Sequence, residues 1–271
     1  MFKIYALSDW VWPGETPKVF GWYHIMWLLI MVVACVVVSL FLSKKHNKEI
    51  DNKLVFYIGA GLIILEIFKQ LFKVIANGYF NWNDVPFQFC SVPMYIAFAT
   101  RFIKKEKFKE TLYIFLASFG FLAGLAVMIY PGSVYNTDYI PMLIHSMIWH
   151  VSMVVMGIHL IISRGYGTKI KEIVWPTVLL IGLVTCALII NVIAQGVYFG
   201  IPSKDYHGSF NLFYISPFEN CPLPIIGDVI KDNVIYPVFF LSYLCAFTLG
   251  VALVWVITIR IRKLFNKNNI N

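Results

Sequence analysis

Charged residues are scarce in this chain of 271 residues, since Asp, Glu, Lys and Arg together make up only 13% of it. A soluble domain carries roughly a quarter of such residues, so the composition excludes an ordinary soluble protein. Hydrophobic residues account for 59% of the chain, and the mean hydropathy is +0.74. We therefore expect an all-α, multi-pass protein of the cell membrane whose constant partners are membrane lipids.

The cysteines lack the close spacing of a structural or metal-binding framework. Five are present, and no two form a Cys-x-x-Cys pair: Cys35, Cys90, Cys186, Cys221 and Cys245. This scatter argues against both a disulfide framework and a zinc cluster. His145 and His150 also lack the i, i+4 spacing of paired metal ligands on a helix. We expect no metal and no other cofactor.

The basic residues lack the interleaved aromatic face of nucleic-acid binders, although the formal net charge is +8. Instead, 16 of the 22 Lys and Arg residues lie in four short segments, at 44–53, 101–109, 164–171 and 260–267. These segments occupy alternate connections between the apolar runs, as the positive-inside rule describes. We expect no nucleic-acid partner, an N-terminus outside the cell and a C-terminus in the cytoplasm.

Seven apolar segments are long enough to cross a bilayer, which takes about 20 helical residues. They run roughly over 21–43, 54–77, 86–103, 111–130, 140–163, 173–199 and 234–259. The sequence therefore predicts one membrane domain over 1–271, built as a bundle of seven transmembrane helices. The outer segment 200–233 holds four prolines among aromatic residues, and we expect it to cap the bundle or to re-enter the membrane.

A polar stripe inside the second segment is the feature around which the other polar groups are interpreted. Four residues share one helix face through their i, i+3, i+4 and i+7 spacing: Glu66, Lys69, Gln70 and Lys73. A charge in hydrocarbon costs a few kcal/mol on the insertion scale, so this face should meet protein or a water-filled cavity. We predict that the stripe binds a substrate, and a purely structural ion pair is the alternative.

Further polar groups fall at the same depth, in the outer half of the bilayer, once each segment has its predicted direction. They come from four other segments: His24, Cys90, His145, His150 and Asn191. We expect them to line an outward-facing polar cavity together with the stripe. This expectation rests on their depth in the bilayer, because the sequence does not give the direction of each side chain around its helix axis. A lone histidine on an apolar helix is more often a structural hydrogen-bonder, and His159, on the face opposite His150, is interpreted in that way.

Cys90 is the candidate nucleophile. It follows Pro86 by four residues, near an expected helix N-terminus, where the pKa of a thiol can be lowered and a nearby histidine can serve as its base. The alternative is that a cysteine in a membrane helix is simply a small apolar residue, which is our interpretation of Cys35, Cys186 and Cys245.

Several motifs, taken in order, resemble those of the YwaF-type integral membrane proteins. They lie at 20–24, 66–70, 86–95 and 211–215, with His150 and Asn191 between them. The segment 86–95 reads Pro-Phe-Gln-Phe-Cys-Ser-Val-Pro-Met-Tyr, and the resemblance runs from about residue 18 to about residue 260. This group includes an animal acyltransferase of phospholipid remodelling in which a cysteine and a histidine are taken as the catalytic pair.

The resemblance implies a membrane-bound acyltransferase with a cysteine nucleophile and a phospholipid substrate. By position, the catalytic pair is Cys90 and His150. His145 is the fallback, because Gly157 stands where the animal relative has a proline seven residues after its histidine.

The same scheme gives roles to the remaining polar groups. Lys69 and Lys73 would hold a lipid phosphate, and a side-chain amide would support the oxyanion. The candidates for that amide are Gln70, Asn191 and Asn211.

Two other functions stay open at this point. A protein that binds or transports a small polar solute would use Glu66 and Lys69 as its ligand or coupling-ion site. A seven-helix sensor or a structural membrane protein matches the number of expected spans, but the last segment lacks the lysine of a retinal-type Schiff base.

Overall fold

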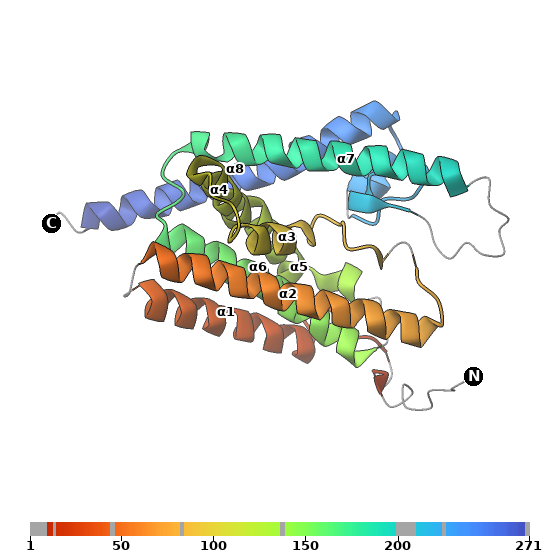
Figure 1. Ribbon diagram of the computed structural model, residues 1–271, viewed down its shortest axis with the longest axis horizontal. Helices are drawn as coiled ribbons and strands as arrows, with labels where there is room; N and C mark the ends of the chain where they lie inside the picture. The colour runs from red at the N-terminus through yellow and green to blue at the C-terminus, as the bar shows by residue number, and fades with distance from the viewer. Residues whose placement is uncertain are drawn as a thin grey trace.

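The computed structural model describes residues 10–12, 15–43, 47–81, 84–135, 139–198, 210–223 and 226–268. Within these ranges the chain forms helices and turns, and no β-strand occurs. Long helices lie side by side along the long axis of the molecule (Figure 1). The expectation of an all-α protein is therefore confirmed.

Six helical units in the described chain are long and apolar enough to cross a membrane, which confirms a multi-pass membrane protein. Five of them are α1 (Trp22–Ser43), α2 (Lys48–Asn77), α6 (Ile140–Ser163), α7 (Val174–Tyr198) and α8 (Tyr236–Asn268). The sixth joins α4 (Glu106–Phe115) through a π-turn (Leu116–Gly120) to α5 (Phe121–Ile129). Each unit covers most of one expected span.

The expected helix over 86–103 needs correction. Only α3 (Val92–Ala99) is helical there, and its eight residues rise about 12 Å against a hydrocarbon thickness of about 30 Å. Two prolines explain the interruption, because neither Pro86 nor Pro93 has a backbone N–H to donate into a helix. Pro93 instead occupies the first turn of α3, where that donor is not needed. Residues 84–91 form turns that approach this short helix.

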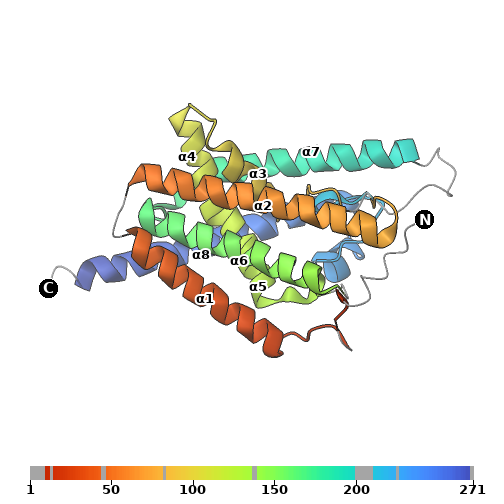
Figure 2. The same cartoon turned by 60° about the horizontal axis from the view of Figure 1, so that its bottom comes forward.

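The direction of the helices defines two ends of the bundle (Figure 1). The first end holds the starts of α1, α6 and α8 and the ends of α2 and α7. The second end holds the opposite termini of these helices, and Figure 2 shows α4 beside the first turns of α7 near that end. The segment between α2 and α4 runs from the first end back toward the second, with α3 in its middle. α8 thus ends at the opposite end from the start of α1.

Close packing inside the bundle depends on glycines that face a neighbouring helix. A Cβ added at Gly124 on α5 would lie 2.9 Å from the carbonyl oxygen of His150 on α6. A Cβ added at Gly157 on α6 would lie 2.6 Å from the Cβ of Phe121. The absence of a side chain at both positions lets α5 and α6 approach closely, as is common among membrane helices.

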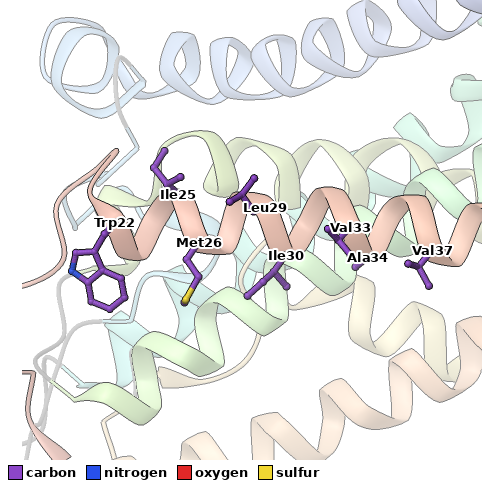
Figure 3. A pocket seen from close by; sticks show the side chains of 8 residues that line it. All are labelled: Trp22, Ile25, Met26, Leu29, Ile30, Val33, Ala34 and Val37. Atoms are coloured by element: carbon purple, nitrogen blue, oxygen red, sulfur yellow. The ribbon is translucent and has the colours of Figure 1, made fainter.

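α1 presents an apolar face to the surroundings. A hollow of about 810 Å³ runs along it, and all eight lining side chains come from α1 itself (Figure 3). They include no ionisable group: Trp22, Ile25, Met26, Leu29, Ile30, Val33, Ala34 and Val37. This face is suited to lipid chains, and the chemistry of the site has to be sought elsewhere.

Candidate functional site

A polar cavity of about 270 Å³ lies between α2, α6 and the turns that precede α3. The polar side chains that line it come from four segments of the chain: Lys69, Lys73, Asp84, Gln88, Cys90, Ser91, His145, Ser146 and Tyr214. Four of these residues were predicted for the site from sequence, namely Lys69, Lys73, Cys90 and His145. Asp84, Gln88, Ser91, Ser146 and Tyr214 were not among the predicted site residues.

The polar stripe of α2 pairs its own charges. Lys69 Nζ lies 2.7 Å from Glu66 Oε1, and Gln70 Nε2 donates to the same oxygen at 2.6 Å. Glu66 is only 5% exposed, so its charge is compensated inside the protein by the neighbouring ammonium group. Of this trio, only Lys69 lines the cavity.

The C-terminal part of the stripe fixes the chain that follows α2. Lys73 Nζ lies 2.5 Å from Asp84 Oδ1, and Gln70 Nε2 also donates to the Asp84 carbonyl oxygen at 2.5 Å. These two contacts anchor the start of the segment that leads to Cys90. The stripe therefore positions one wall of the cavity and supplies two cations to it.

Cys90 and His145 reach this cavity from different elements. Trp149, one turn after His145 on α6, connects them: its Nε1 donates to the Cys90 carbonyl oxygen at 2.9 Å. Its ring stacks on the His145 imidazole with centroids 5.4 Å apart. Nε2 of His145 is buried and has no hydrogen-bond partner among the described residues.

An apolar hollow adjoins the polar cavity at His145, which lines both. The hollow has a volume of about 240 Å³ and lies between α2 and the first turns of α6. Its other lining residues are apolar: Trp10, Leu65, Phe68, Ile140, Pro141, Ile144 and Ile148. A polar chamber and an apolar chamber thus meet at one imidazole.

Tyr214 brings a neutral hydroxyl to the cavity. It is the last residue of the short turn Leu212–Tyr214, in the segment between α7 and α8. Burial raises the pKa of Tyr214 to about 12, so the phenol stays protonated at physiological pH.

His150 lies elsewhere. It is buried, and it is not among the residues that line the polar cavity. Its Nδ1 donates to the Ser146 carbonyl oxygen at 2.7 Å, one turn earlier in α6, and Nε2 has no partner within the described chain. The geometry brings His145, rather than His150, to the cavity that contains Cys90.

His24 also lies outside the cavity. Its Nδ1 accepts a hydrogen bond from the Phe20 backbone at 2.9 Å, and its Nε2 donates to the Met128 carbonyl oxygen at 2.8 Å. Both ring nitrogens are therefore used to join the start of α1 to the end of α5. The side chain is fully buried, as a structural hydrogen-bonder would be.

The side-chain amides of Asn191 and Asn211 form hydrogen bonds with backbone groups and do not line the cavity. Asn191 on α7 donates to the Leu212 carbonyl oxygen at 3.0 Å and accepts from its N–H at 2.8 Å. Asn211 donates to the Asn220 carbonyl oxygen at 2.9 Å and accepts from the Ser216 N–H at 3.0 Å. The two amides shape the segment that carries Tyr214.

This turn needs that support, because Phe213 and Tyr214 have φ values of 56° and 58°, in the left-handed region that side chains rarely adopt. Residues 210–216 are buried or partly buried, and the cap expected over 200–233 stays a prediction. Residues 199–209, 224 and 225 lie outside the described residues.

Replacement of Asn191 by leucine is expected to destabilise the protein by about 2 kcal/mol, because it leaves the buried N–H of Leu212 unpaired and removes one of the two donors to the Leu212 carbonyl oxygen. Thermal unfolding in detergent measures the loss. The exposed neighbour Ile189, replaced by leucine, is the matched control and should change little. An unchanged midpoint in Asn191→Leu would show that the turn does not need this clamp.

A second buried polar cluster, at the second end of the bundle, was missed from sequence. Asp51 on α2 is 1% exposed; its Oδ1 lies 2.9 Å from His159 Nε2 and its Oδ2 lies 2.9 Å from Arg164 Nε. Arg164 also lies 3.1 Å from Glu110 on α4. Glu110 accepts from the Tyr166 hydroxyl, and burial together with this bond raises the pKa of Tyr166, which remains the donor.

Across the described residues, no group of three or more His, Cys, Asp or Glu side chains is placed to hold a metal ion. The fold and the cavity define a class: a helical, multi-pass membrane protein with a small ionisable cavity toward one end of its bundle. The TMEM164 family model matches residues 19–258, nearly the whole chain, so the protein belongs to the TMEM164 family. No curated protein and no solved structure matches the chain.

The family description places the chain among membrane proteins and names no reaction. It carries neither the YwaF name nor an acyltransferase activity. The chemistry of the cavity is therefore a matter for proposal.

Proposed function

We propose that the protein is a membrane-embedded acyltransferase in which the Cys90 thiol is the nucleophile and His145 is its base. One observation carries the proposal: Cys90 and His145 line the same polar cavity and are joined through Trp149. A cysteine and an imidazole that face one chamber are the minimum that nucleophilic acyl transfer requires. His150, the base implied by position in the sequence, is replaced in this proposal by the fallback His145.

The reaction proceeds in two balanced halves. His145 takes the thiol proton, the Cys90 sulfur attacks the carbonyl carbon of a lipid ester, and the ester C–O bond breaks. The departing lipid alkoxide takes the proton from the imidazolium and leaves as a lysolipid, while the acyl chain stays on sulfur as a thioester. A second lysolipid hydroxyl then gives its proton to His145 and attacks the thioester, which forms a new ester and restores the thiol.

The two chambers that meet at His145 suit an amphipathic substrate. An acyl chain fits the apolar hollow between α2 and α6. The headgroup phosphate of a phospholipid fits the polar cavity, where Lys69 and Lys73, each already paired with a carboxylate, have further ammonium N–H groups to donate. The amides of Gln70, Asn191 and Asn211 already bond to the protein, so oxyanion support falls to other groups that line the cavity.

We further infer that the chain crosses the membrane seven times, with its N-terminus outside and the polar cavity toward the outer face. The run from α2 to α4 provides the seventh crossing with only α3 helical. The basic segments lie at the second end of the bundle, as the positive-inside rule requires of a cytoplasmic end. An odd number of crossings then puts the two termini on opposite sides.

The experiment follows acyl transfer from a labelled phospholipid to a lysolipid by the purified full chain in nanodiscs. Cys90→Ala and His145→Gln are expected to reduce transfer by about a hundredfold or more, since each removes a reacting group. Cys90→Ser should retain a trace at most. Intact-mass analysis should find a hydroxylamine-labile acyl group on the wild-type chain and none on Cys90→Ala.

Cys245→Ala is the matched control, because that thiol is exposed on α8 and lies outside the cavity. Full transfer by Cys90→Ala, with the variant folded, would refute the proposal. Transfer that survives His145→Gln but not His150→Gln would move the base to His150. Both histidine variants need a thermal-unfolding check, because both side chains are buried.

Binding or transport of a small polar solute is the second candidate, and the buried Glu66–Lys69 pair beside the cavity favours it. This function predicts solute-dependent thermal stabilisation that survives Cys90→Ala and is lost in Glu66→Gln. The acyltransferase predicts the reverse sensitivity.

A further inference from the structure

A second hollow with both apolar and basic residues lies at the opposite end of the bundle from the polar cavity. A groove of about 890 Å³ runs between α4 and α7. Its walls are largely apolar: Phe108 comes from α4, and Trp175, Gly182 and Cys186 come from α7, with Lys105 and Lys107 at one end. No function discussed above uses it.

The dimensions of the groove match one leaflet of a bilayer. Trp175 lies in the first turn of α7 and Cys186 lies eleven residues later, which corresponds to a rise of about 16 Å. Half of the hydrocarbon core is about 15 Å thick. The groove therefore extends from the headgroup level of the second end to about the middle of the bilayer, the depth that one acyl chain occupies.

The charge at its mouth is of one sign. Lys105 and Lys107 are exposed, and neither forms an ion pair within the described chain. The carboxylates of α4 are engaged away from them: Glu106 lies 3.8 Å from Lys109, and Glu110 pairs with Arg164. Two ammonium groups without a paired carboxylate thus lie at the headgroup level, at the end of the apolar groove.

We propose that this groove is a binding site for one anionic phospholipid of the leaflet at the second end. Its acyl chain lies between α4 and α7, and its phosphate-bearing headgroup contacts Lys105 and Lys107. Basic pockets between membrane helices on the cytoplasmic side bind anionic lipid headgroups. The groove has the same two features, which are basic side chains at one end and an apolar space between two helices. The site is independent of the chemistry at Cys90 and does not rest on it.

A larger side chain at Gly182 can test whether a lipid chain occupies the groove without disturbing the fold. A Cβ added at Gly182 has no heavy atom within 4 Å, so a larger side chain would fill the groove and leave the helix packing intact. Gly61 on α2 has the same open surroundings and does not line this groove, which makes Gly61→Leu the matched control for Gly182→Leu.

The experiment is native mass spectrometry of the full chain in detergent, titrated with phosphatidylglycerol or phosphatidylcholine of identical acyl chains. Wild type should bind one phosphatidylglycerol in clear preference, with a contribution of about fivefold per lysine that weakens as salt rises. Combined replacement Lys105→Gln and Lys107→Gln should remove the preference. The exposed pair Lys104→Gln and Lys263→Gln removes equal charge outside the groove and should retain the preference.

Gly182→Leu should weaken the binding of both lipids, while Gly61→Leu should not. Equal affinity of wild type for the two lipids would overturn the proposal, as would an unchanged preference in the Lys105 and Lys107 double variant. If inorganic phosphate competed as well as the whole lipid, an acyl-chain site would be excluded. A dimer in wild type that Gly182→Leu converts to a monomer would assign the groove to a second copy of the chain instead.

Discussion

Replacement of Gly59 by valine is expected to prevent stable folding, or to lower the free energy of unfolding by about 3 kcal/mol or more. A Cβ at this position of α2 would lie 2.5 Å from the backbone nitrogen of Phe98 and 2.9 Å from the backbone carbon of Ala97. Backbone atoms cannot rotate away as a flexible side chain can, so α3 would have to shift as a unit. Because α3 begins two residues after Cys90, the same shift would distort the polar cavity.

Gly61 provides the control on the same helix, two residues later. An added Cβ there has no heavy atom within 4 Å, so Gly61→Ala should be neutral or slightly stabilising through better helix propensity. The measurement is the folded yield and the thermal midpoint of Gly59→Ala, Gly59→Val and Gly61→Ala in one detergent. A Gly59→Val protein as stable as Gly61→Ala would mean that α2 and α3 are not packed as closely as described.

The polar stripe of α2 shows what helical periodicity can predict. The spacing of Glu66, Lys69 and Gln70 put them on one face, and the structure joins all three through Glu66 Oε1. Depth also predicted that Cys90 and His145 would lie near the stripe, and both line the cavity that contains Lys69. Spacing within a helix and depth along the bundle both follow from the constant rise per residue.

The direction in which each side chain points around its helix axis could not be predicted, because it depends on how each helix is rotated against its neighbours. His24 and His150 have suitable depths, yet their rings face α5 and the preceding turn of α6. Asn191 faces the backbone of Leu212 rather than the cavity. No pattern in a single sequence specifies such rotations, since they result from side-chain packing between segments far apart in the chain.

The third span illustrates a different limit. Hydropathy over 86–103 is sufficient for a span, but hydropathy measures the preference for lipid and not the continuity of a helix. Pro86 and Pro93 interrupt the backbone bonding, and side chains satisfy carbonyl groups that a helix would have used. Trp149 Nε1 donates to the Cys90 carbonyl oxygen at 2.9 Å, and the Tyr95 hydroxyl donates to the Pro86 carbonyl oxygen at 2.9 Å. Irregular backbone at membrane depth is tolerated where protein covers it or where it lines a cavity, and this segment does line one.

The cluster around Arg164 was missed because Arg164 was counted as one of many orientation charges. The positive-inside rule treats each basic residue of a connection alike and says nothing about burial. In the structure the Arg164 side chain is 5% exposed. Its partners on α2 and α4 are more than fifty residues away in the chain, so only the tertiary fold could identify it as the centre of a network.

Removal of Arg164 is therefore expected to have the largest effect on stability of any single charge among the residues that the structure describes. Its guanidinium joins three helices: Nε lies 2.9 Å from Asp51 Oδ2, and Nη1 lies 3.1 Å from Glu110 Oε1. Nη2 donates to Asn52 Oδ1 at 2.6 Å, and the group lies 4.8 Å from the centroid of the Tyr113 ring. Arg164→Met keeps the apolar stem but leaves the buried Asp51 carboxylate with His159 as its remaining ionisable partner.

Breaking such a buried pair from one side costs about 3–5 kcal/mol, and equilibrium unfolding of purified Arg164→Met should report a loss in that range. Arg101→Met removes an exposed arginine near the same end and should stay within about 0.5 kcal/mol of wild type. Asp51→Asn combined with Arg164→Met should lose less than the two single losses added together, because the double variant no longer buries an uncompensated charge. Strict additivity of the two losses would show that the carboxylate and the guanidinium act independently, and would remove the network as the element that fixes α2, α4 and α6 at this end.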